Sequence, residues 1–142
     1  MKKLVMMFMM LALVLGVQAQ ELKVGDALPK FELNSSVYGQ VKPADLKGKV
    51  VLVSLFATWC GPCRTGMKEM ESVKDSLKEK GVDFVYITDT SSDSNDWLAY
   101  VARYEGTHYI VPEDKKLAMQ IPEYENAIPH YLIYDREGKF IK

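Results

Sequence analysis

Short apolar runs alternate with amphipathic segments along most of this 142-residue chain. Apolar, β-branched runs of strand length occupy residues 50–56, 82–88 and 128–134, with a shorter extended piece at 110–111. Apolar residues at helical spacing occupy 64–80, 97–104 and 115–121. Because strands alternate with helices, the pattern predicts an α/β fold with a central mixed sheet and helices on both faces.

Turn and capping residues lie at the ends of these expected elements. One face of the expected helix at 64–80 carries Met67, Met70, Val73 and Leu77. This helix ends before Gly81, a residue type favoured just after a helix. The polar loop 91–96 offers Ser and Asp side chains that can cap the next helix. After the last strand, 135–138 predicts a turn and 139–141 the start of an antiparallel partner.

The N-terminal residues have the composition of an export signal. Two lysines, Lys2 and Lys3, precede a 14-residue apolar stretch at 4–17, and Ala19 lies where signal peptides are usually cleaved. A bilayer span needs about 20 apolar residues. We therefore expect a signal peptide at 1–19 and one domain at 20–142, in the periplasm or another extracytoplasmic compartment. The alternative is that the apolar stretch stays as an N-terminal membrane anchor.

The charge distribution bears on the kind of partner. The formal net charge is −1, and basic and acidic residues are mixed along the chain. Nucleic-acid and membrane-surface binding both rely on clustered lysine and arginine. We therefore expect no nucleic-acid partner and no membrane contact beyond the signal segment.

A Cys-x-x-Cys motif follows the expected strand at 50–56 directly. Cys60 and Cys63 are the only two cysteines, and Cys60 precedes the expected helix at 64–80. A helix N-terminus leaves backbone N–H groups unpaired, which favours a thiolate there. Cys60 can then attack a disulfide, and Cys63, one helical turn away, can resolve the mixed disulfide. The sequence predicts a thiol–disulfide oxidoreductase that needs no cofactor.

Three other uses of such a cysteine pair fit the sequence less well. A zinc site needs four ligands, but His108 and His130 lie 22 residues apart, without metal-ligand spacing. A copper chaperone would want Cys-x-x-x-Cys with a nearby histidine, and a peroxiredoxin-like peroxidase would want Thr-x-x-Cys with an activating arginine. The sequence around Thr58 and Cys60 is one residue short of either spacing. The copper chaperone and the peroxidase remain the alternative functions.

Several motifs together resemble the TlpA/ResA group of exported thioredoxin-like proteins. They are VVLVSLFATWCGPCR at 50–64, the Ile128–Pro129 dipeptide, YDREGK at 134–139, and the lead-in motifs GDALPKF at 25–31 and LKGK at 46–49. The resemblance covers about residues 24–142 and implies a thioredoxin-like fold with an N-terminal hairpin extension, expected at 31–41. It also implies thiol–disulfide exchange, usually as a reductant of exported proteins.

The resemblance assigns roles to residues around the cysteine pair. It implies that Pro129 is a cis-proline that faces the Cys60 sulfur and that Ile128 presents its backbone to a substrate strand. The residues expected to cover the site or to tune its redox potential are Trp59, Gly61 and Pro62. The Gly-Pro pair is the one found in reducing thioredoxins and so favours an electron donor. The expected partners are a disulfide-containing exported protein, with apocytochrome c as the family example, and a redox protein that supplies electrons.

The chain departs from the family in three places. Thioredoxins carry an aspartate six residues before the first cysteine, where this chain has Ser54. ResA-type proteins carry a glutamate three residues after the second cysteine, where this chain has Gly66. The family continues into a C-terminal helix, whereas this sequence stops at Lys142, so we expect a C-terminally truncated domain.

Either of the two missing carboxylates would accept the Cys63 proton when Cys63 attacks the mixed disulfide. Their absence raises the question of which other residue acts as the base. His130 directly follows the expected cis-proline, on the strand expected beside the one that carries Ser54. An imidazole with an ordinary pKa near 6.5 can accept a proton at neutral pH. We therefore expect His130 to approach Cys63. The alternatives are that His130 faces solvent or that water takes the proton.

Overall fold

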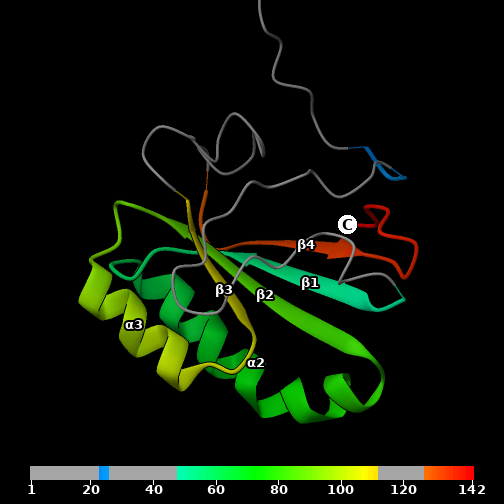
Figure 1. Cartoon of the computed structure of the whole chain (residues 1–142), viewed down its shortest axis with the longest axis horizontal. Helices are drawn as coiled ribbons and strands as arrows, with labels where there is room; N and C mark the ends of the chain where they lie inside the picture. The colour runs from blue at the N-terminus through cyan, green and yellow to red at the C-terminus, as the bar shows by residue number, and fades with distance from the viewer. Residues whose placement is uncertain (1–22, 26–47, 112–126) are drawn as a thin grey trace, which may run out of the picture.

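The computed structural model describes residues 23–25, 48–111 and 127–142, and these form a sheet with two helices (Figure 1). The strands are β1 (Val50–Leu55), β2 (Val82–Asp89), β3 (Thr107–Val111) and β4 (His130–Tyr134). Their order in the sheet is β3-β2-β1-β4. β1 pairs in parallel with β2, β2 in parallel with β3, and β1 antiparallel with β4. The predicted mixed α/β sheet is therefore confirmed.

Helices α2 (Gly61–Glu79) and α3 (Ser94–Arg103) both lie on one face of this sheet, as Figure 1 shows. Their buried side chains, among them Met67 of α2 and Trp97 of α3, pack with Phe84 and Tyr86 of β2. The alternation of strands and helices in the sequence predicts helices on both faces. The further helix predicted at 115–121 lies outside the described residues, as do the expected hairpin at 31–41 and the expected signal peptide at 1–19.

The ends of both helices follow from local sequence. Asp93 caps α3, and its carboxylate accepts hydrogen bonds from the backbone N–H groups of Asn95 and Asp96 at 2.8 and 3.2 Å. This confirms the expected capping by the polar loop. α2 ends at Glu79, and Gly81 follows with a φ of +84°, which a residue with a Cβ adopts at a cost. α2 begins at Gly61, three residues before the expected start, because Pro62 is well suited to the first turn of a helix.

The buried face of α2 differs from the expected one at two neighbouring positions. Val73 is 48% exposed, whereas Lys74 is 3% exposed. The Lys74 ammonium donates to Glu71 Oε1 at 2.6 Å and to the Tyr86 hydroxyl at 3.2 Å. It also lies 5.3 Å from the ring centroids of Phe84 and Tyr86. Partners on both α2 and β2 therefore offset the cost of burying this charge, and the prediction for Val73 was wrong.

The other face of the sheet carries a second apolar cluster, which includes Val53, Leu55, Ile87, Leu132 and Tyr134. After β4, the chain turns at 135–138 and returns alongside it, with an antiparallel bridge between Tyr134 and Phe140. This return is the expected antiparallel partner, and the Ile141 backbone N–H also donates to the Ile133 carbonyl oxygen at 2.8 Å. No helix in the described part of the chain is both long and apolar enough to span a bilayer.

Candidate redox site

Cys60 and Cys63 lie at the start of α2 and are joined by a disulfide, with their Cα atoms 5.3 Å apart. Cys60 is the N-cap residue of the helix, and its Sγ accepts a hydrogen bond from the Cys63 backbone N–H at 3.2 Å. In the reduced protein the same N–H and the positive end of the helix dipole would stabilise a Cys60 thiolate. The geometry therefore supplies the electrostatic setting that the sequence predicts.

The two sulfurs differ in access. Cys63 is fully buried, whereas Cys60 is 5% exposed and lies next to the exposed Trp59. An incoming disulfide can therefore reach Cys60 first. The Trp59 ring is 64% exposed, and its Nε1–H donates to Ser91 Oγ at 3.1 Å, so it lies at the edge of the site. The Thr58 backbone N–H donates to Ser92 Oγ at 3.0 Å, which fixes this loop to the end of β2.

The entry to β4 lies against Cys60. The Ile128–Pro129 peptide bond is cis, as the resemblance implies. The Ile128 carbonyl oxygen lies 3.9 Å from Cys60 Sγ, although the two residues are 68 positions apart in sequence. Ile128 is half-buried against the cluster that contains both cysteines. The backbone of Ile128 therefore lies beside Cys60, and its expected contact with a substrate strand remains a prediction.

His130 does not approach Cys63, which corrects the expectation for this residue. In the antiparallel ladder His130 pairs with Leu55, and directly paired residues share a face of the sheet. Leu55 belongs to the cluster on the face away from α2, whereas Cys63 belongs to the cluster on the α2 side. The alternation of side chains along β4 therefore directs His130 to the face of the sheet opposite to α2 and Cys63.

Tyr131 takes the position on the α2 side that was expected for His130. It pairs with Ser54 across the ladder, and its hydroxyl lies so close to Gly66 that a Cβ there would collide with it. Burial raises the pKa of Tyr131, so the phenol stays protonated at neutral pH and cannot act as a base. Side chains of neighbouring residues on a strand point to opposite faces of the sheet, so His130 and Tyr131 cannot share a face. This alternation along β4 is the sequence signal that could have identified Tyr131.

The Ser54 hydroxyl is buried beneath the same helix face. Ser54 is 2% exposed, and its Oγ has no hydrogen-bond partner among the described residues. Ser54 and Gly66 occupy the two positions of the missing carboxylates. Tyr131 lies on β4 and pairs with Ser54. The described residues contain no cluster of three or more side chains that could ligate a metal ion.

Comparison with known proteins yields relatives that are named as thiol–disulfide oxidoreductases. A family model described as Redoxin matches residues 23–142. A thiol-disulfide oxidoreductase ResA from Oceanobacillus iheyensis is 37% identical over 99 residues, which cover 66% of this chain and 50% of that protein. Its namesake from Bacillus thuringiensis is 26% identical over 125 residues, covering 87% and 70% of the two chains. The matched part of this chain thus spans half the length of the first relative.

The fold is also found among solved structures. A crystal structure assigned as thiol:disulfide interchange protein DsbE from Chlorobium tepidum superimposes with a TM-score of 0.66 at 27% identity. The match covers 86% of this chain and 84% of that chain. The sheet and helices described above therefore form a thioredoxin-like α/β fold.

Proposed function

The chain belongs to the Redoxin family, and from this premise we propose that it exchanges disulfides with exported proteins through Cys60 and Cys63. The observation that carries the proposal is the arrangement of the two sulfurs. Cys60 is the accessible cap of α2, and Cys63 is buried one helical turn behind it. This asymmetry supports attack by Cys60 and resolution by Cys63.

The exchange proceeds in two balanced steps. The Cys60 thiolate attacks one sulfur of a substrate disulfide, forming a Cys60–substrate bond and releasing the other substrate sulfur as a thiolate. The Cys63 thiol then loses its proton and attacks Cys60, which releases the second substrate thiolate. Two electrons pass to the substrate, and the protein is left with the Cys60–Cys63 disulfide. A dithiol partner must then reduce this disulfide before the next turnover.

We infer that the protein works outside the cytosol as a reductant. Support comes from the signal-like residues 1–19 and from the Gly61–Pro62 pair between the cysteines. The substrate class is a disulfide-containing exported protein, for which the resemblance to the TlpA/ResA group offers apocytochrome c. The direction can be measured, because a reduction potential near −270 mV is thioredoxin-like and one near −120 mV is strongly oxidising.

Replacement of single cysteines tests the two roles. Cys63→Ala should attack a model disulfide peptide through Cys60 and then stall, so that a covalent protein–peptide adduct accumulates and disappears on addition of dithiol. The measurement is intact-protein mass spectrometry before and after reduction. Cys60→Ala is the matched control and should form little adduct, because Cys63 is buried. Adduct formation by Cys60→Ala alone would show that the roles are reversed.

A further inference from the structure

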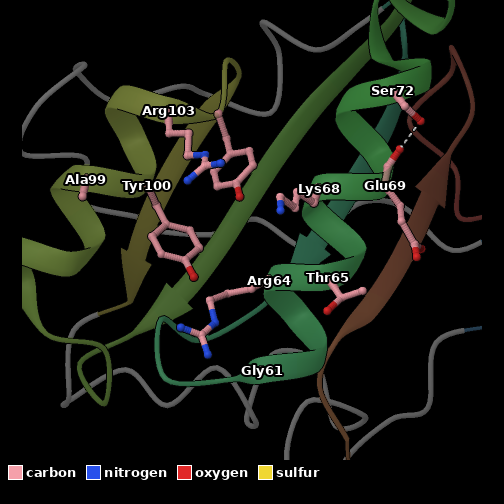
Figure 2. Close-up of a pocket in the computed structure, with 10 residues that line it drawn as sticks. Gly61, Arg64, Thr65, Lys68, Glu69, Ser72, Ala99, Tyr100 and Arg103 are labelled. Atoms are coloured by element: carbon pink, nitrogen blue, oxygen red, sulfur yellow. Dashed lines mark hydrogen bonds between the residues drawn. The ribbon is translucent and has the colours of Figure 1, made fainter.

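A groove runs between α2 and α3, and its lining begins at Gly61, the residue after Cys60 (Figure 2). Its volume is about 1190 Å³, and it extends along α2 from Gly61 to Ser72. At 1.5 Å of rise per residue this stretch of helix measures roughly 16 Å. An extended peptide of about five residues has the same length. The dimensions therefore suit a segment of polypeptide. We call this feature the α2–α3 groove.

The lining of the α2–α3 groove is strongly basic. Figure 2 shows Arg64 and Lys68 of α2 and Arg103 of α3 extending into the space between the two helices. All three side chains are exposed, and none forms an ion pair within the part of the chain that the structure describes. Among the described residues that line the groove, Glu69 is the one acidic side chain. Since the whole chain has a net charge of −1, this local excess of positive charge runs against the overall balance.

Two carboxylates close in sequence to these cations are already paired with other lysines. Glu71 accepts from Lys74, and Glu105 pairs with Lys78. Arg103 lies with its guanidinium 5.6 Å from the Tyr104 ring, which holds it over the groove and leaves its charge available. Tyr100 adds an aromatic wall. Three cations and an aromatic surface are suited to acidic side chains carried on a peptide backbone.

Two lining residues of the groove belong to the segment that carries the redox pair. Gly61, at one end of the groove, follows Cys60 in sequence, and Arg64 follows Cys63. We propose that the α2–α3 groove binds an acidic segment of the protein that exchanges its disulfide with Cys60. This inference rests on the proposed function and names the chemistry of the substrate next to its reactive cysteine. The cations would speed encounter and orient the segment.

The test compares two synthetic peptides with the same internal disulfide, flanked by aspartates in one and by lysines in the other. Reduced protein is mixed with each peptide, and the second-order rate of peptide reduction is measured at low and high salt. At low salt we expect the acidic peptide to react about tenfold faster, because steering by complementary charges acts on the association rate. The difference should shrink at high salt, since salt screens exposed charges.

Variants locate the effect in the groove. Lys68→Gln with Arg103→Gln should reduce the acidic-to-basic rate ratio by about twofold or more, since each exposed charge contributes a factor of roughly 1.4 to 5. The matched control is Lys80→Gln with Lys139→Gln, which removes the same charge from exposed positions outside the groove lining. The control should keep the original ratio.

The outcomes separate this inference from the proposed function. If the protein reduces neither peptide, the proposed function fails and the groove has no substrate to bind. Equal rates for the two peptides would overturn the proposed role of the groove and would leave the proposed exchange activity unaffected. A ratio that falls equally in both double variants would also overturn it, because net charge and not the groove would then set the preference.

Discussion

His108 is a fully buried imidazole of β3 that stacks on Tyr86 of β2. It is 1% exposed, and its ring stacks on Tyr86 with the centroids 4.7 Å apart. Its Nε2 lies 2.6 Å from the Tyr104 carbonyl oxygen, which can only accept, so Nε2 carries the proton. Burial lowers the pKa of His108, and the positive charge of Lys74 lowers it further, whereas the bond to Tyr104 opposes the shift. The folded protein therefore resists protonation of this ring.

This lowered pKa predicts a loss of stability in mild acid. The unfolded chain binds a proton with a histidine pKa near 6.5, and the folded protein binds it only at lower pH. The contribution of neutral His108 to the free energy of unfolding is thus fully present above about pH 6.5 and is lost as the pH falls through the pKa of the folded protein. Urea unfolding over this range should show the decline, and His108→Gln should flatten it. Because this variant also changes the packing around a buried position, an NMR titration of His108 in the unaltered protein provides a second measurement. A pKa at or above 6.5 would contradict the prediction.

The connection from α3 to β3 depends on Gly106 at the scale of the elements. Its φ is +147°, a conformation that L side chains rarely adopt. A Cβ at this position would lie 2.8 Å from the Phe84 carbonyl oxygen and 2.9 Å from Tyr86 Cε2. The backbone of β2 cannot move away without disturbing the sheet. Glycine is therefore needed where the chain passes from the helix layer to the edge strand.

Gly106→Ala should lower the free energy of unfolding by about 1–3 kcal/mol, the usual cost of a strained backbone position. Denaturant unfolding at neutral pH measures the change. Gly61→Ala is a suitable comparison, because it lies at the start of α2 with no atom within 4 Å of an added Cβ, and its stability should change little. Equal losses in both variants would show that Gly106 is not specially constrained.

The redox site is assembled from segments that only the whole fold brings together. β4 pairs with β1 alone among the described strands, and the residues just before it place Ile128 against Cys60. Leu132, in the middle of β4, is 1% exposed and packs in the cluster that includes Val53 and Leu55. The packing of Leu132 on one face of the sheet therefore holds β4 in place, and with it the Ile128 backbone beside Cys60.

Leu132→Ala should destabilise the protein by about 2–5 kcal/mol, because it removes a buried side chain and leaves a cavity. Thermal or urea unfolding gives the value. Leu98→Ala, at a side chain that is 45% exposed on α3, removes the same atoms from the surface and should change stability by less than about 0.5 kcal/mol. A small loss for Leu132→Ala would indicate that β4 is only loosely attached to the sheet.

The sequence by itself determined the elements and the chemistry, because both depend on local patterns. The apolar runs predicted β1, β2 and β4 to within two residues at each end, and the polar loop predicted the cap of α3. The order of strand, Cys-x-x-Cys and helix placed Cys60 at a helix N-terminus without any knowledge of distant contacts. The cis Ile128–Pro129 bond came from the family resemblance and not from the residues alone.

Only the tertiary structure decided which side chains meet, because such contacts depend on register and packing between distant segments. The pairing of Leu55 with His130 directed His130 away from Cys63 and brought Tyr131 to Gly66, a choice that a one-residue shift would reverse. Lys74 is buried because Tyr86 of another element accepts its hydrogen bond. Likewise Arg64 and Arg103 face one groove because α2 and α3 pack side by side on the sheet. Periodicity sets the face of a residue within its own element, and the packing of elements sets what that face meets.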